Sequence, residues 1–270
     1  MNWGQKLVKG FKGLVGALVF YTRLPISAKI PYEIDRIGRF APVVGLLLGN
    51  LLLIGDRGLA WLEVGSFSRA VLLVCLWCLL TGGLHLDGVM DTADGLAVQN
   101  PQLRLQVMQD SQTGAFGVMA GGLLLLLKVA FLTDLEYNNT SPYSLRLWAL
   151  VMAPVWGRWG QVLAIACYPY LRPTGKGAFL KAEMQLPIDF LWGAGCLIFL
   201  TGLQIWGMGN WVLGMGLLLG GGTIAWGVGY WFHSRLGGHT GDSYGAVVEW
   251  TEVAFLGLVL VVEVVVDRFT

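Results

Sequence analysis

The sequence predicts an all-α integral membrane protein, a polytopic helical bundle of about seven transmembrane helices with an N-terminal amphipathic or re-entrant helix. Three observations support this fold class: 55% of the 270 residues are hydrophobic, 13% are charged, and the mean hydropathy is +0.63. A soluble domain usually carries about 25% charged residues. A soluble protein of this size has too little interior to hide so much apolar surface, so the bilayer is the expected environment.

The N-terminal segment has a basic start and an apolar middle, but no small-x-small cleavage site before Arg23. It is therefore expected to be mature protein and not a signal peptide. Lys6, Lys9 and Lys12 follow a spacing of three, which predicts the basic face of a helix that lies on the membrane. Residues 10–21 are alternatively a re-entrant element.

Seven apolar stretches follow, each close to the ~20 residues that one crossing needs. They lie at about 40–55, 67–84, 115–133, 146–168, 188–207, 211–232 and 245–266. The first is the shortest and has the least certain boundaries. No repeat or linker divides the chain, so residues 1–270 are expected to form a single transmembrane catalytic domain.

Lys and Arg residues are concentrated in the N-terminal segment and in alternate loops, which predicts a cytoplasmic N-terminus. This topology places the polar loops 85–114, 169–187 and 233–244 on the cytoplasmic side, and Arg69 and Arg146 in outer loops. The residues with unusual chemistry thus gather on one face of the membrane.

The most informative motif is GGLHLDGVMDTADGL, from Gly82 to Leu96. Asp87, Asp91 and Asp94 are spaced i, i+4, i+7, so they share one face of a helix. Carboxylates this close repel one another strongly in a low-dielectric setting unless a cation lies among them. Oxygen ligands without cysteine favour Mg²⁺, which completes its shell with water and substrate phosphate. The motif predicts a Mg²⁺-bridged diphosphate site; the alternative is a solvated acidic helix end.

Neighbouring glycines and a second polar run extend this predicted site. Gly88 and Gly95 are expected to let a ligand approach the backbone closely. In the run 108–117, Asp110 is expected to be a further metal ligand. Ser111 is better explained as the N-cap of the following helix.

A third polar run, Arg235–Gly245, is rich in glycine and has Asp242 at the start of the next helix. Gly238 and Gly241 are expected to expose backbone N–H groups that hold phosphate, and Asp242 to join the metal ligands. A plain turn between two helices is the alternative. Phosphate binding gains weight because the predicted topology puts this loop beside the aspartates.

Basic side chains are needed for the phosphate oxygens that the metal leaves free. The candidates on the predicted cytoplasmic side are Arg23, Arg104, Arg172, Lys176 and Arg235. Each alone is equally typical of a positive-inside anchor. We take Arg23, Arg104 and Arg235, with Gly238 and Gly241, as the predicted phosphate contacts.

Charges also occur inside the predicted spans. Arg158 lies in the middle of one, where a charge is costly and indicates a functional site; it is expected to pair with Glu249 or Glu252. Lys128 is expected to reach the membrane surface with its flexible stem.

Two histidines are candidates for a general base, His85 and His239. His85 projects about 200° away from Asp87 on an ideal helix, so a structural role for it is an equal alternative. The candidate catalytic residues are His85, Asp94 and Asp110.

The chain resembles the cobalamin synthase family, the adenosylcobinamide-GDP ribazoletransferases. The resemblance rests on motifs that run in order along nearly the whole chain: Phe20–Pro25, Gly38–Phe40, Gly82–Leu96, Met108–Gly117, Tyr168–Tyr170 with Arg172–Pro173, and Leu236–Glu252. Gln109 and Gln112 stand where the family is expected to have more basic residues.

This resemblance implies a Mg²⁺-dependent enzyme of the bacterial inner (cytoplasmic) membrane whose active site faces the cytoplasm. Adenosylcobinamide-GDP would react with α-ribazole, or its 5′-phosphate, to give adenosylcobalamin, or its phosphate, and GMP. Asp87, Asp91 and Asp94 would hold one or two Mg²⁺ ions, and Asp110 or Asp242 would add a ligand or act as base. Positioning and charge neutralisation dominate such phosphoryl transfers.

Other readings of the acidic site remain open. A CDP-alcohol phosphotransferase or a prenyltransferase also places spaced aspartates at helix ends, and a cation transporter lines its path with acids. A nucleic-acid partner is not expected, because the net charge is +1 and no basic stripe is present. The sequence leaves a homo-oligomer open.

Overall fold

The computed structural model describes residues 3–135, 144–175 and 177–269. This part of the chain is built from helices, with an isolated β-bridge between Tyr170 and His239, so the predicted all-α class is confirmed. The α-helices are α1 (Trp3–Tyr21), α2 (Ala41–Trp61), α3 (Ser66–Thr81), α4 (Leu84–Ala97), α5 (Arg104–Val107), α6 (Ala115–Asp134), α7 (Leu145–Cys167), α8 (Ala178–Ala182), α9 (Ile188–Met208), α10 (Trp211–Leu236) and α11 (Gly241–Phe269).

Six helices in the described part of the chain are long and apolar enough to cross a membrane. The first apolar span runs from Ile37 to Trp61 and is longer than predicted, with 25 residues, because the 3-10 helix Ile37–Phe40 leads directly into α2. The predicted second span is α3, which forms a bent pair with α4. Counted as one broken span, this pair is the seventh.

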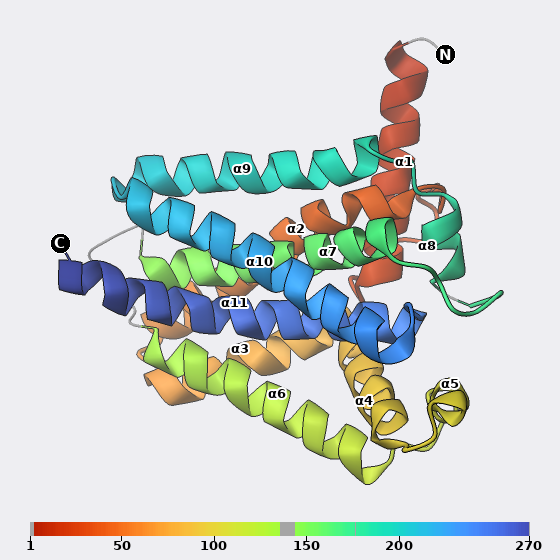
Figure 1. Ribbon diagram of the computed structural model, residues 1–270. Helices are drawn as coiled ribbons and strands as arrows, with labels where there is room; N and C mark the ends of the chain where they lie inside the picture. The colour runs from red at the N-terminus through yellow and green to blue at the C-terminus, as the bar shows by residue number, and fades with distance from the viewer. Residues whose placement is uncertain (1–2, 136–143, 176, 270) are drawn as a thin grey trace.

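The turn between α3 and α4 depends on two glycines. Gly82 and Gly83 have φ values of 64° and 69°, a left-handed conformation that glycine adopts without strain. The helix axis turns by 91° at this point. As a result α4 leaves the direction of the spans and runs along one end of the bundle, where Figure 1 also places α1, α5 and α8.

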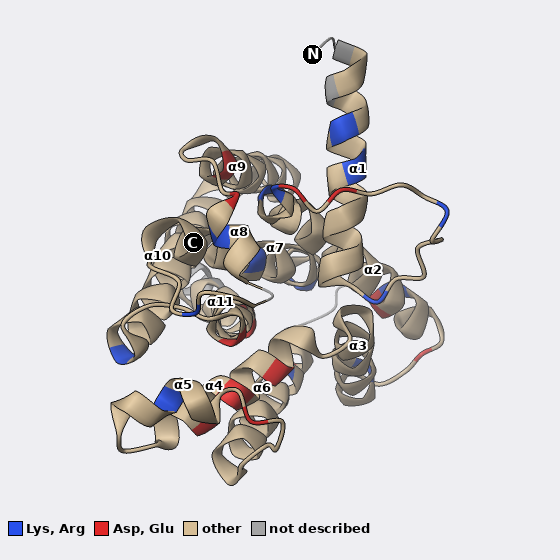
Figure 2. Cartoon of the chain, turned by 90° about the vertical axis from the view of Figure 1, so that its right-hand side faces the viewer, with Lys and Arg blue, Asp and Glu red and all other residues tan. Residues whose placement is uncertain are grey.

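Helix α1 is continuous from Trp3 to Tyr21, so residues 10–21 do not form a separate re-entrant element. It runs roughly perpendicular to the long helices, upright beside the bundle in Figure 1 and again in Figure 2. That orientation agrees with a helix that lies along the membrane surface, as its spaced lysines predict.

Helix α7 is the centre of the bundle, and its residues 148–165 are all buried. It packs against α2 at Gly45 and Gly49, where a Cβ would come closer than 3.0 Å to the backbone of Pro154 and Val151. Small residues that let two helix backbones approach in this way are typical of membrane bundles.

The charges inside the spans form a buried network. Arg158 on α7 pairs with Glu252 on α11, which confirms the predicted partner. Lys128 on α6 lies 2.7 Å from Glu249 and 2.6 Å from Glu252. Its Nζ also lies 4.0 Å from the centre of the Trp77 ring. The prediction that Lys128 reaches the surface is wrong, because carboxylates of α11 replace water as its partners.

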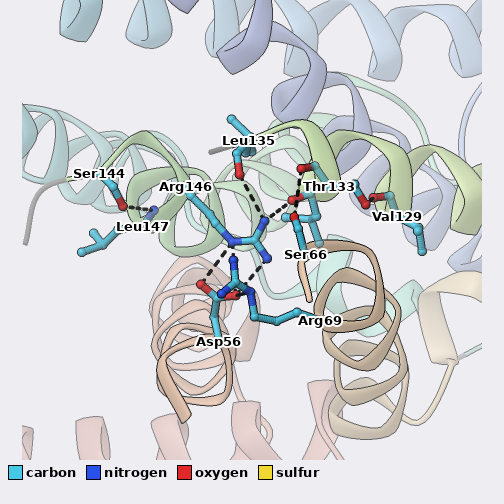
Figure 3. A network of polar contacts seen from close by, with 10 residues as sticks. Asp56, Ser66, Arg69, Val129, Thr133, Leu135, Ser144, Arg146 and Leu147 are labelled. Atoms are coloured by element: carbon cyan, nitrogen blue, oxygen red, sulfur yellow. Dashed lines mark hydrogen bonds and ion pairs between the residues drawn. The ribbon is translucent and has the colours of Figure 1, made fainter. Parts of the chain in front are cut away.

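A second buried network lies at the end of the bundle away from α4, and Figure 3 shows its contacts. Asp56 on α2 lies 2.8 Å from Arg146 on α7 and 3.1 Å from Arg69 on α3. Arg146 also donates hydrogen bonds to the carbonyls of Leu132 and Leu135. The placement of Arg69 and Arg146 in outer loops is therefore wrong: both lie buried within helices.

Candidate functional site

Helix α4 carries the three aspartates of the most informative motif, as their spacing predicts. Asp91 is repelled by the charges of Asp87, Asp94 and Asp242, and attracted by that of Arg172. The carboxylates of Asp87, Asp91 and Asp94 on α4 therefore gather in one region with that of Asp242, although Asp242 is far away in the sequence.

Helix α11 brings Asp242 to α4 through an unusually close crossing. A Cβ on Gly88 would lie less than 3.0 Å from the backbone carbonyl oxygen of Asp242. One turn away, Gly245 faces the backbone of His85 in the same manner. Gly88 was expected to admit a ligand, and this is wrong, because the backbone of α11 fills the space. Gly95 likewise faces Met108.

A partly enclosed cavity of about 280 Å³ opens where α4, α7 and α11 meet. Of the predicted site residues, Asp87, Asp242, His85 and Gly241 line it. Arg172, one of the basic candidates, also lines it, and the structure adds four side chains that were not predicted: Phe20, Gln161, Tyr170 and Tyr244. The cavity thus combines two carboxylates, one guanidinium group, neutral polar groups and aromatic rings.

Arg172 is the basic side chain that the structure places at the aspartates. Its Nη1 lies 3.0 Å from Oδ2 of Asp242, and its Nη2 donates to the carbonyl of Leu105 at 3.4 Å. The predicted phosphate contacts Arg104 and Arg235 lie elsewhere: Arg104 donates to the carbonyl of Arg235 at 2.8 Å. This contact ties α5 to the end of α10, and neither arginine lines the cavity.

Arg23 lies on the other side of α4. It covers Gly82 and lines a second, more open hollow together with Asp87 and Met90. Asp87 therefore stands between two hollows, with Arg23 on one side and Arg172 on the other. Lys176, a further candidate, lies outside the described residues.

Asp94 is held by backbone amides at the start of α6. Its carboxylate accepts hydrogen bonds from the N–H groups of Gly114 at 2.6 Å and Gly117 at 2.8 Å. It caps this helix from a distance in sequence, and a negative charge is favourable at a helix N-terminus. The predicted N-cap, Ser111, is wrong, because α6 begins after Gly114.

Asp110 lies in the exposed loop before α6. Its carboxylate accepts a hydrogen bond from the N–H of Gln112 at 3.0 Å, which is a local turn contact. Its role as a metal ligand or catalytic residue stays a prediction, as does metal binding by Asp94.

The glycine-rich loop is held by main-chain pairing. Gly238 packs against the carbonyl of Pro169, and the β-bridge joins His239 to Tyr170. Gly238 is therefore a packing position, and of the two predicted phosphate-binding glycines only Gly241 lines the cavity.

His239 is buried in this loop and is occupied by structural hydrogen bonds. Burial lowers the pKa of His239 to about 4, so the ring is neutral at physiological pH. Its Nε2 donates to the carbonyl of Gly229 at 3.2 Å, and its Nδ1 accepts from the hydroxyl of Ser243 at 3.1 Å. With both ring nitrogens engaged, His239 orders the loop and is not available as the general base.

No three His, Cys, Asp or Glu side chains of the described residues already surround one metal position. Mg²⁺ commonly takes only one or two carboxylates from the protein and completes its shell with water and substrate phosphates. Asp87 and Asp242, which share the cavity with a single arginine, fit that pattern.

The close crossing of α4 and α11 leads to a test. Gly88→Ala is expected to lower the free energy of unfolding by about 1–3 kcal/mol, because the added methyl group collides with backbone and not with a flexible side chain. The matched control is Gly122→Ala on α6, where an added Cβ meets nothing within 4 Å. Unfolding titrations in mixed micelles measure both variants, and equal stability of the two would contradict this packing.

The fold and the site together define a polytopic helical membrane protein with an acidic, partly enclosed polar cavity at one end of its bundle. Residues 13–260 match the family model described as cobalamin-5-phosphate synthase. The chain belongs to this family, and the match includes every residue that lines the cavity.

Curated relatives are similar over nearly their full length. The adenosylcobinamide-GDP ribazoletransferase of Synechocystis sp. is 49% identical, and the match covers 97% of this chain and 100% of the relative. The protein of the same name from Trichormus variabilis is 47% identical over 90% of this chain and 94% of its own. That from Desulforamulus reducens is 38% identical over 93% and 96%. No solved structure matches the chain.

Three polar residues that line the cavity were not predicted from the sequence: Gln161, Tyr170 and Tyr244. Tyr170 and Tyr244 fall inside motifs that carry the family resemblance, so position in a motif is a signal that would have found them. Gln161 lies in the apolar stretch of α7, and a lone amide inside a predicted span is the signal there.

Proposed function

We propose that this protein transfers the adenosylcobinamide phosphate group from adenosylcobinamide-GDP to a hydroxyl group of α-ribazole or its 5′-phosphate, and releases GMP. The new bond joins phosphorus to the ribose oxygen, and the broken bond is the phosphoanhydride to GMP. The observation that carries this proposal is the similarity over residues 13–260 to a family whose relatives bear the name of this transfer, with Asp87 and Asp242 inside the matched region.

The acidic cavity suits a metal-assisted phosphoryl transfer. We propose that Asp87, Asp91 and Asp242 hold one or two Mg²⁺ ions, each ion taking one or two of these carboxylates. The charge of Asp91 lies close to those of Asp87 and Asp242, and the cavity that Asp87 and Asp242 line holds a single arginine. Magnesium supplies charge neutralisation of the diphosphate when it is bound. Arg172 keeps Asp242 in place by its ion pair and presents a guanidinium group toward the cavity.

His85 is our proposed acceptor for the proton of the attacking hydroxyl. It is 2% exposed, lines the cavity, and has no hydrogen-bond partner for either ring nitrogen among the described residues. Asp94 acts differently in this proposal: by holding the start of α6 it fixes the position of the helix that carries Asp91.

We place the site on the cytoplasmic face of the inner membrane. The end of the bundle that carries the cavity also carries Arg23, Arg36, Arg104 and Arg172, and Lys and Arg residues favour the cytoplasmic side. Helix α1, with its lysines, lies at the same end in Figure 1.

The direct test is a substrate panel on the purified protein in nanodiscs. GMP is expected to form only when adenosylcobinamide-GDP and α-ribazole, or its 5′-phosphate, are both present. CMP release from a CDP-linked lipid, or pyrophosphate release from a prenyl diphosphate, would assign the other transferase classes instead. Cation flux in proteoliposomes without GMP formation would indicate a transporter.

A further inference from the structure

Several buried polar atoms of the residues that line the cavity have no hydrogen-bond partner among the described residues. The side-chain oxygen of Gln161, the hydroxyl of Tyr244 and both ring nitrogens of His85 have no hydrogen-bond partner among the described residues. These side chains are 4%, 0% and 2% exposed, and all of them line the same cavity. Buried polar groups left without partners are costly, so their grouping in one cavity points to a polar ligand.

Aromatic rings form other walls of the same cavity. The rings of Tyr170 and Tyr244 have their centres 5.8 Å apart, and Phe20, in the last turn of α1, lines the same cavity. The hydroxyl of Tyr170 faces the backbone amides of Gly177 and Gly241, which line the same cavity. Flat apolar surfaces next to unpartnered polar groups suit an aromatic base joined to a sugar.

The position of Asp87 separates two binding regions. It lines the partly enclosed cavity and also the open hollow of Arg23. In phosphoryl transfer the attacking and leaving oxygens lie roughly in line on opposite sides of phosphorus. A partly enclosed cavity on one side of Asp87 and a more open hollow on the other match an acceptor and a donor that approach from opposite sides.

We infer that the partly enclosed cavity is the binding site of the nucleoside acceptor, α-ribazole, and that the more open hollow receives the diphosphate of the corrinoid donor. The inference rests on the proposed function and assigns its two substrates to two sides of Asp87. The benzimidazole base occupies the part of the cavity lined by Phe20 and Tyr170. Gln161, Tyr244 and His85 bind the polar atoms of the nucleoside.

Size and charge distinguish this acceptor from the donor. A corrin macrocycle with its amide side chains is several times larger than a nucleoside and does not enter a cavity of about 280 Å³. The charged residues that line the cavity are Asp87, Asp242 and Arg172, and Arg172 is already paired with Asp242. Without a bound cation this lining carries a net negative charge, so it accepts a neutral nucleoside and repels the diphosphate that the guanosine of the donor carries.

Gln161→Leu tests the inference by direct binding. α-Ribazole is added to the full-length protein in nanodiscs, wild type and variant in separate experiments. A chelator is present, the donor is absent, and binding is measured by calorimetry. We expect the variant to bind α-ribazole about tenfold more weakly, because it loses a hydrogen bond in a buried site. In turnover, the KM for α-ribazole is expected to rise about tenfold while the KM for adenosylcobinamide-GDP stays the same.

The matched control is Gln204→Leu, because Gln204 is another buried glutamine, 1% exposed, and its side-chain oxygen also has no partner among the described residues. It lies on α9, outside the cavity, and its substitution is expected to leave α-ribazole binding unchanged. Tyr244→Phe is a second test variant, for use if Gln161→Leu does not fold. It removes the hydroxyl group of Tyr244 and keeps the aromatic ring.

Three results would overturn the inference: unchanged α-ribazole binding in both cavity variants, a rise in the KM for the donor instead of the acceptor, or displacement of α-ribazole by GMP alone at equal concentration. Absence of GMP release from wild-type protein would refute the proposed function. The binding measurement contains no donor, so the two failures are distinguishable.

Discussion

Asp91→Asn is expected to abolish GMP release, with a loss of more than about 100-fold, while the protein stays inserted and folded. Asparagine keeps the size of the side chain but removes the charge that acts among Asp87, Asp94 and Asp242. Loss of a residue that merely supports a metal ligand typically costs 10–100-fold, so loss of a ligand itself is expected to cost more. GMP release from the purified variant in nanodiscs measures this effect.

A stability measurement separates the role of Asp91 in the site from a role in folding. Mutual repulsion of the carboxylates opposes folding when no metal is bound. Asp91→Asn is therefore expected to raise the thermal midpoint in the presence of a chelator while activity is lost. Asp35→Asn, at an exposed position, is the matched control and is expected to change neither quantity. Near wild-type turnover of Asp91→Asn would remove Asp91 from the proposed metal site.

Asp56→Asn is expected to be the most destabilising of the substitutions discussed. It leaves the guanidinium groups of Arg69 and Arg146 buried without the carboxylate that both contact, as Figure 3 shows. Removal of one partner from a buried ion pair typically costs about 3–5 kcal/mol. Because this network joins α2, α3 and α7, the variant is expected to lose cooperative unfolding at this end of the bundle.

The free energy of unfolding, measured by SDS titration in mixed micelles, checks this expectation. Asp35→Asn is again the control, since its ion pair with Lys9 spans 3.9 Å and is exposed; it is expected to cost less than about 1 kcal/mol. Adding Arg69→Met to Asp56→Asn removes one of the two stranded charges and is expected to recover part of the loss. A stability of Asp56→Asn equal to that of the control would contradict the role given to this network.

The features that the sequence predicted correctly depend on short-range periodicity. The apolar stretches predicted the spans, and the spacing of Asp87, Asp91 and Asp94 predicted one helix. The pairing of Arg158 with Glu252 was also predictable, because an intramembrane charge requires a partner and few were available.

The features that it did not predict depend on contacts between distant elements. The hydrogen bonds of Asp94 to Gly114 and Gly117 arise only when α4 and α6 pack together. The spacing of the aspartates does not contain this contact, so it predicted for Asp94 the same role as for Asp87 and Asp91. Lys128 was misplaced for a similar reason, since its partners on α11 are more than a hundred residues away along the chain. Among the basic candidates, only packing distinguishes Arg172 at the cavity from Arg104 at α10.

The central claim is that the aspartates of α4 and α11 share a divalent cation that binds the diphosphate of the donor. The most direct measurement is GMP release by wild-type protein after chelation and again after stepwise return of Mg²⁺. We predict that release stops in the chelator and returns with Mg²⁺, with a saturating dependence on its concentration. Full turnover in the chelator would contradict the claim.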